Sequence, residues 1–383
     1  MGEAGKNGAP LRIALVLRGI EERQGTGVYT RNLTDELLAM DRKNEYVLFY
    51  SNPDLLGHYS QYDNVTERVL RAPGKLLWDQ IAVPLAAAQE GVDLIFHPKF
   101  TVPLLSRRPT VMTIHGSTWF VHPELYTRAA IAYIKLFMPL YCRKARYIIS
   151  NSDLTSGDFI RLVNVPPAKV QTIHLGCNKE FHAITDRVHL EDVRRRYALP
   201  EKFILAVSRY DPRKNFKNMI AAFRALRQRI PCKLVVTGLR CEKYREEYAL
   251  DADGTADDVQ FLGWIEHDDL PAIYNLAHCM FFPSVYEEFG IPSCEAMACG
   301  CPPVISKTGA LPEIAADAGV LVDPFDPDDM ATALERIWTD DAFRAEHARR
   351  SLERAKAFTW RGCAEKTLKV FEGVMSGALP PHD

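Results

Sequence analysis

The chain of 383 residues is long enough for two domains of ordinary size, each with its own hydrophobic core. Its composition, 47% apolar and 25% charged, is that of a soluble globular protein. A formal net charge of −2 argues against a nucleic-acid-binding protein, so nucleic acid is not an expected partner.

Cysteine usage and the terminal sequence indicate a cytoplasmic protein. Nine cysteines lie between Cys142 and Cys363 without paired spacing, which is typical of a reducing compartment. The group at Cys294, Cys299 and Cys301 has no C-x-x-C beside it, so we expect no metal site there. The first ten residues are polar and lack the apolar core of a signal peptide, and no run approaches the ~20 apolar residues of a membrane span.

A first strand is predicted at residues 12–17 (RIALVL), followed by a loop that contains Gly25 and Gly27. An amphipathic helix is predicted from Val28 onward. A strand, a glycine loop and a helix at the start of a doubly wound sheet are where such sheets bind phosphates. The alternative is a flexible surface loop, because G-x-G without a third glycine is a weak signal.

Four more runs in the first half predict strands that alternate with helices, which indicates a parallel sheet with helical crossovers: residues 46–50, 93–97, 110–114 and 147–150. His115 follows the strand at 110–114, at the carboxyl edge where such sheets place their chemistry. A histidine there can share a proton near neutral pH or present its backbone to a sugar. A purely structural role is the alternative for His115, and we assign that role to His122.

Residues 125–146 form a basic amphipathic stretch, LYTRAAIAYIKLFMPLYCRKAR, that Pro139 is expected to bend or break. Such a stretch can lie on anionic lipid headgroups. It can equally be a helix with one face on the core and its charges in solvent. Residues 1–180 carry 21 Lys and Arg against 17 Asp and Glu, a mild excess that fits a first half facing an anionic surface.

The second half opens with a predicted strand at 203–208 and a turn at Asp211-Pro212, flanked by Arg209 and Lys214. Two cations at the carboxyl edge of a strand can neutralise a diphosphate and stabilise charge on a departing nucleotide. A solvated basic turn is the alternative. Further strands complete a second doubly wound domain and are predicted at 233–237, 259–262, 278–282, 303–306 and 319–322.

Residues 281–300, FFPSVYEEFGIPSCEAMACG, predict a buried strand, a short acidic loop and a helix. Gly290 allows a tight turn or a close approach to a ligand, and Pro292 suits the first helical position. The N–H groups of Phe289, Gly290 and Ile291 are then expected to point out of the helix N-terminus. The partial positive charge there favours an anion such as a phosphate.

Two carboxylates, Glu287 and Glu295, flank this phosphate seat with seven residues between them. Carboxylates accept hydrogen bonds from hydroxyls, and a diphosphate seat with an acid on either side suits a nucleotide sugar. One acid would bind the transferred sugar and the other the ribose. The alternative makes Glu287 a solvated loop charge and Glu295 a partner of the helix dipole.

The run 281–300 resembles the signature of the retaining GT-B glycosyltransferases of the group 1, or family-4, type, whose usual form is E-G-F-G-L/I-P-x-x-E-A-M-A-x-G. This chain departs from that form at Glu288, where glycine is usual, and at Cys294, where leucine is usual. Glu288 is expected to point away from the diphosphate, because it would add a negative charge beside it.

Other segments resemble the same family in the same order along the chain. Arg209 and Lys214 match its R-x-x-x-x-K-N pattern, and residues 114–126 look like its T-I/V-H-D segment with Gly116 in place of Asp. The resemblance implies that His115 is an active-site residue. It also implies that Gly25 and Gly27 lie against the donor phosphate or the acceptor.

The segment at 261–279 is similar to the family's nucleotide-base segment, which implies that Trp264 and Ile265 border the base. The fold implied is α/β, GT-B: two facing Rossmann-like doubly wound domains. We expect residues 1–182 to form the acceptor-binding domain and 183–360 the nucleotide-sugar-binding domain. Residues 361–383 would return to the first domain as a helix and tail.

The activity implied is that of a retaining hexosyltransferase that moves a hexose from a nucleoside diphosphate sugar to a hydroxyl by front-face attack. No cofactor or metal is expected, because Arg209, Lys214 and the helix N-terminus would neutralise the diphosphate. The likeness is closest to bacterial mannosyltransferases of polysaccharide assembly. It therefore implies GDP-mannose as donor, with UDP-glucose or UDP-N-acetylhexosamine as alternatives.

The expected acceptor is a glycan or a lipid-linked molecule that offers a hydroxyl, and the protein can make peripheral contact with an anionic membrane. Two other functions stay open: a nucleotide-sugar epimerase of the same architecture and a sugar-binding protein without chemistry.

Overall fold

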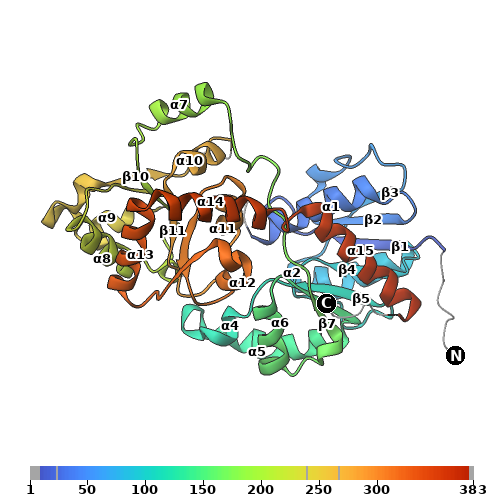
Figure 1. Ribbon diagram of the computed structural model, residues 1–383. Helices are drawn as coiled ribbons and strands as arrows, with labels where there is room; N and C mark the ends of the chain where they lie inside the picture. The colour runs from blue at the N-terminus through green and yellow to red at the C-terminus, as the bar shows by residue number, and fades with distance from the viewer. Residues whose placement is uncertain (1–8, 23–24, 239, 266–267, 379–383) are drawn as a thin grey trace. The chain divides into compact units, whose positions relative to one another are not determined.

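The computed structural model describes residues 9–22, 25–238, 240–265 and 268–378. The chain forms two compact units, Met1–Gly176 with Trp360–Asp383, and Cys177–Thr359 (Figure 1). The first boundary lies before the expected 182/183, because Cys177 already belongs to the second unit: it pairs with Thr359 in a β-bridge, and its N–H donates to the Phe358 carbonyl at 3.0 Å. The second boundary lies at 359/360 instead of 360/361, because the last helix begins at Trp360.

The first unit contains a seven-stranded parallel sheet in the order β3-β2-β1-β4-β5-β6-β7. Its strands are β1 Arg12–Val16, β2 Glu45–Tyr50, β3 Val65–Val69, β4 Leu94–His97, β5 Thr110–Ile114, β6 Tyr147–Ser150 and β7 Val170–Thr172. Strands β1, β2, β4, β5 and β6 are almost wholly buried, which explains their near-continuous apolar sequences. Between β1 and β4 the winding of the chain reverses, and doubly wound sheets open a crevice at that point.

Helices cover both faces of this sheet: α1 Thr26–Met40, α2 Lys75–Leu77, α3 Val83–Gln89, α4 Thr118–Val121, α5 Arg128–Lys144, α6 Asp153–Val163 and α15 Trp360–Ser376, with a π-helical turn at Trp78–Ala82. Met112 and Ile114 of β5 pack under α5 and α6. Thr113 alternates with them and faces the other way, where its hydroxyl lies 3.0 Å from that of Tyr29 in α1.

The last helix, α15, belongs to the first unit, which confirms the expected return of the C-terminus. It packs along α1, and Phe371 lies 5.0 Å from Phe96 of β4, measured between ring centroids. All five strands predicted in the first half are present. The two strands of this sheet without a prediction are its edges β3 and β7. Pro139 was expected to bend or break its helix, and a break is excluded because α5 continues through Pro139 to Lys144.

The second unit contains a six-stranded parallel sheet in the order β10-β9-β8-β11-β12-β13. The six strands predicted in this half are all present, as β8 Ile204–Val207, β9 Leu234–Thr237, β10 Val259–Gly263, β11 Cys279–Phe282, β12 Pro303–Ser306 and β13 Val320–Val322. Its helices are α7 Arg187–Arg196, α8 Phe216–Arg227, α9 Lys243–Glu247, α10 Leu270–Leu276, α11 Ile291–Ala298, α12 Leu311–Ala315, α13 Pro327–Thr339 and α14 Asp341–Ala355. The main core lies where α8 and α13 cover one face of the sheet. Two units, each with a parallel β-sheet covered by helices, confirm the predicted α/β fold class.

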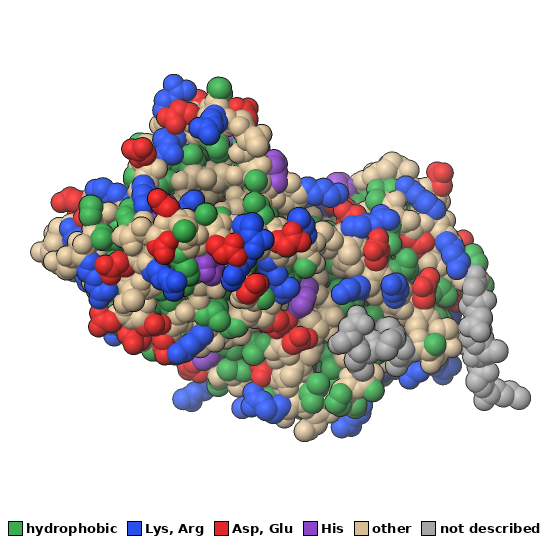
Figure 2. Space-filling model, viewed as in Figure 1, with side chains coloured by type: hydrophobic (Ala, Val, Ile, Leu, Met, Phe, Trp, Pro, Cys, Tyr) green, Lys and Arg blue, Asp and Glu red, His purple; other side chains and the backbone are tan. Residues whose placement is uncertain are grey.

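The outer face of α14 is rich in charged residues. Along α14, acidic and basic side chains are interspersed on the face shown in Figure 2, and Glu346 lies 2.9 Å from Arg349. Within the described ranges, none of the helices combines the length and the apolar composition needed to cross a membrane.

Candidate active site

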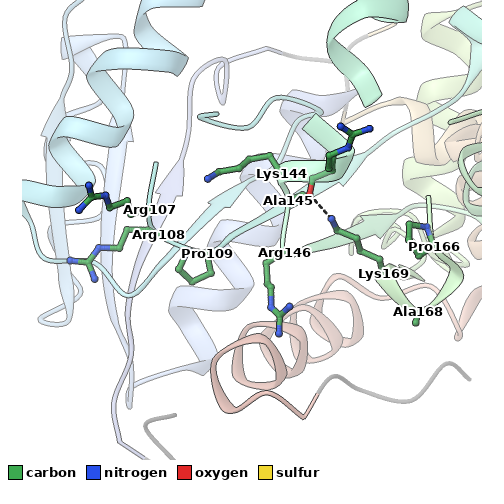
Figure 3. A pocket seen from close by; sticks show the side chains of 10 residues that line it. Arg107, Arg108, Pro109, Lys144, Ala145, Arg146, Pro166, Ala168 and Lys169 are labelled. Atoms are coloured by element: carbon green, nitrogen blue, oxygen red, sulfur yellow. Dashed lines mark hydrogen bonds between the residues drawn. The ribbon is translucent and has the colours of Figure 1, made fainter. Parts of the chain in front are cut away.

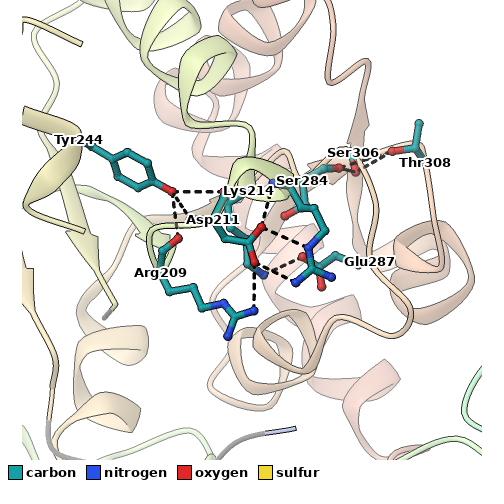
Figure 4. Close-up of polar contacts among 9 residues, drawn as sticks. Arg209, Asp211, Lys214, Tyr244, Ser284, Glu287, Ser306 and Thr308 are labelled. Atoms are coloured by element: carbon teal, nitrogen blue, oxygen red, sulfur yellow. Dashed lines mark hydrogen bonds and ion pairs between the residues drawn. The ribbon is translucent and has the colours of Figure 1, made fainter. Parts of the chain in front are cut away.

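The loops that follow the neighbouring strands β8 and β11 lie side by side at the carboxyl edge of the second sheet (Figure 4). The N–H of Val285 donates to the carbonyl of Arg213 at 2.9 Å. The side-chain amide of Asn215 donates to the carbonyls of Pro283 at 3.0 Å and Pro324 at 2.6 Å. These bonds join the basic turn to the acidic loop at the switch point of the sheet.

The acidic loop is also held from its other side. Thr308 donates its hydroxyl to the carbonyl of Val285 at 2.9 Å, and the N–H of Ala310 donates to the carbonyl of Glu287 at 2.9 Å. The backbone at Glu287 is therefore fixed between two loops, which positions its side chain.

Lys214 and Glu287, predicted at one site, form an ion pair with 2.7 Å between Nζ and Oε1. Their side chains are only 13% and 16% exposed. The ammonium of Lys214 also lies 4.5 Å above the ring of Phe282. A diphosphate that reached this position would compete with Glu287 for the lysine and leave the carboxylate available to a hydroxyl.

Arg209 precedes the same turn, in which the N–H and the guanidinium of Arg213 donate to Asp211 at 3.0 and 2.8 Å. Burial opposes ionisation of Asp211, but hydrogen bonds from Arg213 and then Arg209 outweigh it and hold the pKa of Asp211 well below its ordinary value. The guanidinium of Arg209 lies 3.0 Å from Asp211, and its side chain stays 46% exposed. The turn thus presents one accessible guanidinium at the sheet edge.

The helix α11 begins where the sequence predicts it. Gly290 is its N-cap with φ +91°, and a Cβ there would overlap the side chain of Leu311, so glycine is required. Phe289 and Gly290 are buried, Ile291 is half-buried, and no side chain caps the helix. Pro292 occupies the second helical position and not the predicted first, because Ile291 opens the helix.

Glu295 has a raised pKa and is therefore not fully ionised near neutral pH. Burial, together with the charge of Glu180, raises its pKa to about 7, although the hydrogen bond from Tyr274 lowers it. The Tyr274 hydroxyl donates to Oε2 at 3.0 Å. Near neutral pH this carboxyl group is therefore a mixture of acid and carboxylate and can both donate and accept a hydrogen bond.

Ile265 and Trp264, which follow β10, differ in exposure. Ile265 is 5% exposed and packs inside, whereas Trp264 is 50% exposed. Of the two, only the indole has a face available to a ligand. The buried side chain of Ile265 could only support such a contact from inside the fold.

Gly25 and Gly27 lie at the start of α1 in the first unit. Gly25 is the N-cap, with φ +55°. Gly27 is buried in the first turn, where a Cβ would collide with the carbonyl oxygen of Glu22. Glu22 therefore rests directly on the first turn of the helix, and glycine is required at position 27 for this close approach.

His115 lies beside the same helix. Its Nε2–H donates to the carbonyl of Pro98 at 2.7 Å, and its ring meets that of Tyr29 edge-on at 4.7 Å. Asn151 donates to its carbonyl at 3.0 Å. Burial lowers the pKa of His115 to about 4, so the ring is neutral at neutral pH with Nδ1 as an acceptor. The expectation that it shares a proton near neutral pH is not supported by this environment.

Both halves of the chain match known protein families. Residues 191–357 match the family described as "Glycosyl transferases group 1", and residues 23–181 match "Glycosyltransferase Family 4". A glycosyltransferase of Methanocaldococcus jannaschii is 30% identical over 71% of this chain and 71% of its own length. The chain belongs to the group 1 glycosyltransferases. This glycosyltransferase is also 28% identical to O-antigen chain mannosyltransferase B of Escherichia coli, over 91% of this chain and 96% of that one.

Solved structures share the fold of the glycosyltransferase at low identity. Sucrose-phosphate synthase of Thermosynechococcus elongatus superposes with a TM-score of 0.77 at 24% identity, covering 96% of this chain and 100% of that chain. Anabaena HepE in complex with UDP-glucose superposes with a TM-score of 0.73 at 19% identity, over 95% and 100%. These likenesses confirm the GT-B fold.

A largely buried charged cluster in the first unit of the glycosyltransferase was missed by the sequence analysis. Arg18 lies 2.8 Å from Asp79, and Nε2 of His97 lies 3.5 Å from the same carboxylate. Arg18 follows β1 and His97 ends β4, so the cluster lies at the switch point of the first sheet. Their positions at strand ends were a usable signal, whereas Asp79 lies in a π-helical turn that no motif marks.

Proposed function

We propose that this glycosyltransferase transfers mannose from GDP-mannose to a hydroxyl of a glycan or lipid-linked acceptor, with retention of configuration. The half-buried pair of Lys214 and Glu287, beside the N-terminus of α11, carries the proposal. The choice of mannose is supported by the E. coli relative, which this chain matches over nearly its whole length. UDP-glucose or UDP-N-acetylhexosamine is the alternative donor, and the fold neighbour bound to UDP-glucose favours it.

The second unit would bind the donor. Lys214, Arg209 and the N–H groups at the start of α11 (Phe289, Gly290 and Ile291) would hold the diphosphate. On binding, Lys214 would turn from Glu287 toward a phosphate oxygen, and Glu287 would accept hydrogen bonds from the hexose hydroxyls. The two cations would neutralise the leaving diphosphate as Mg²⁺ does elsewhere, so no metal and no further cofactor is required.

The remaining donor contacts follow from burial and protonation. Glu295, with a pKa of about 7, would exchange hydrogen bonds with the ribose hydroxyls. Ile265 would support the base region from within, behind the exposed Trp264. The loop at Gly25 and Gly27 would let the backbone of the first unit approach the donor phosphate or the acceptor.

Transfer would proceed on one face of the sugar. The acceptor oxygen bonds to the anomeric carbon as the bond to the donor phosphate breaks, and the acceptor proton passes to the departing phosphate oxygen. Glu287, released by Lys214 on donor binding, would orient the sugar through hydrogen bonds from its hydroxyls and would not attack the anomeric carbon. His115, neutral with Nδ1 as acceptor, would orient a hydroxyl without taking its proton.

The first unit would bind the acceptor, and its basic helix α5 would bring the protein into peripheral contact with an anionic membrane. A cytoplasmic location is part of the proposal, because the cysteines are free thiols and eight of the nine are buried.

A panel of nucleotide sugars, screened by thermal shift and then by product analysis, tests the function. A rise in melting temperature with GDP-mannose or with UDP sugars identifies the donor. Incubation without acceptor separates the alternatives, because an epimerase would change the donor sugar and a transferase would not. Retention is tested by the anomeric configuration of the product in NMR, and metal independence by activity in the presence of a chelator.

A further inference from the structure

A cavity of about 520 Å³ lies at the amino edge of the first sheet (Figure 3). Its lining segments immediately precede three strands: residues 107–109 before β5, 143–146 before β6 and 166–169 before β7. Because the strands are parallel, these segments meet at one edge, whereas His115 follows β5 at the other. Five residues of strand span about 16 Å, so within the first unit the cavity and His115 lie at opposite edges of the sheet.

Every charged residue that lines this cavity is a lysine or an arginine: Arg107, Arg108, Arg143, Lys144, Arg146 and Lys169. The two ammonium groups bond to backbone carbonyls, Lys144 to Ser106 at 2.6 Å and Lys169 to Arg143 at 2.8 Å. Burial is the main cause that lowers the pKa of Lys169, and the charge of Arg146 adds to it. Arg146 and Lys169 therefore repel each other, and an anion bound between them would relieve that repulsion.

An apolar surface adjoins the cavity. Leu136 and Leu140 of α5 are 62% and 40% exposed. Arg143 follows Leu140 by three residues, so the leucines and the arginine share one face of the helix. Leu105, 83% exposed, precedes Ser106, whose carbonyl binds Lys144. In Figure 2, blue and green side chains gather over the part of the view where Figure 1 places α5.

The cations and the exposed leucines, taken together, distinguish between two possible ligands of the cavity, a soluble anion and an anionic bilayer. A soluble anion would explain the lysines and arginines but would leave the leucines in water. Basic residues beside exposed leucines are the composition of a protein surface that lies in the interface of an anionic bilayer.

We propose that the cationic cavity binds the phosphate groups of anionic phospholipids while Leu105, Leu136 and Leu140 enter the bilayer interface. The inference does not rest on the donor or on the reaction, because it uses the amino edge of the first sheet alone. It gives the proposed membrane contact a defined face of the molecule.

The test is vesicle binding by the full-length protein, with vesicles of phosphatidylcholine alone or mixed with phosphatidylglycerol. The variant Arg107→Gln/Arg143→Gln/Arg146→Gln removes three exposed cations and keeps both anchored lysines. It should bind mixed vesicles roughly 100-fold more weakly, because each cation near such a surface contributes about 1 kcal/mol. The matched control removes as many exposed cations from the second unit, Arg195→Gln/Arg349→Gln/Lys356→Gln, and should bind as the wild type does.

A second variant tests the apolar half of the surface. Leu136→Ser/Leu140→Ser should also weaken binding to mixed vesicles while leaving its salt dependence unchanged, because all the cations remain. The triple variant of Arg107, Arg143 and Arg146 is the pocket variant. The proposal would be overturned if the pocket and control variants lost vesicle affinity equally. It would also be overturned if the wild type bound neutral vesicles as tightly as mixed ones. If pyrophosphate raises the melting temperature of the wild type but not of the pocket variant, and vesicles do not bind, the cavity takes a soluble anion and the membrane assignment is wrong.

Nucleotide-sugar binding, measured on the same preparations, keeps this result apart from the proposed function. The pocket variant should bind the donor as the wild type does, which also shows that it is folded. Vesicle binding without donor binding in the wild type would overturn the donor assignment alone. Donor binding without vesicle binding would overturn the membrane face alone.

Discussion

Replacing Glu295 by glutamine should stabilise the protein above pH 7 and change little below pH 4.5. Burial raises the pKa of Glu295 from 4.5 to about 7. At about 1.4 kcal/mol for each pH unit, ionising it in the folded protein costs roughly 3 kcal/mol. The folded state holds the proton more tightly than the unfolded state, so the free energy of unfolding falls as pH rises from 4.5 to 7. Glutamine is neutral over this whole pH range, and its side-chain carbonyl can still accept the hydrogen bond from the Tyr274 hydroxyl.

Urea unfolding of the wild type and Glu295→Gln across this pH range measures the effect. The free energy of unfolding of Glu295→Gln minus that of the wild type should increase with pH by roughly 3 kcal/mol and level off above about pH 7. All other titrating groups are shared, so the difference reports Glu295. Glu346→Gln is the control: hydrogen bonds from Arg349 and Arg350 lower the pKa of Glu346 to about 2, below the window. A difference between wild type and Glu295→Gln that stays constant with pH would refute the assigned pKa.

Three further predictions concern the other site residues. Lys214→Met and Glu287→Gln should each lower kcat/KM by about 100-fold or more with the fold retained, and full activity in either would remove the pair from the mechanism. Gly27→Ala should destabilise by about 1–3 kcal/mol, because its Cβ would collide with Glu22; an unchanged melting curve would contradict that close approach. The ring of His115, with its pKa lowered by burial to about 4, should show no titration in NMR between pH 5.5 and 8; a midpoint near 6.5 would show that the ring is not buried as described.

Strands were predictable where they are buried on both faces. Every predicted strand is present, because central parallel strands have near-continuous apolar sequences. The edge strands β3 (VTERV) and β7 (VQT) escaped prediction, since they mix polar and apolar residues and carry less of that signal.

The site was predictable to the level of its loops. Lys214 and Glu287 each follow a strand, and their motifs marked them in the sequence. Their direct pairing depends on β8 lying next to β11, an order that no local pattern encodes. The same holds for Glu295: its pKa is raised by burial in the folded chain, and its hydrogen-bond partner Tyr274 belongs to another helix.

The cationic cavity shows a similar limit. The basic stretch at 125–146 was recognisable as an amphipathic helix, with a solvated face and a lipid-facing surface as open interpretations. Arg107 and Lys169 complete the cavity from two other loops that only the sheet order brings together. Charge patterns read along one segment cannot reveal a pocket whose walls come from three.

Binding of GDP-mannose, followed by calorimetry with UDP-glucose in parallel, tests the donor site most directly. The wild type should bind at least one of these nucleotide sugars. The Arg209→Ala/Lys214→Ala double variant should bind it at least about 100-fold more weakly, because two charge-assisted hydrogen bonds are lost. Failure of the wild type to bind either compound, or equal affinity in the double variant, would contradict a donor site at the carboxyl edge of the second sheet.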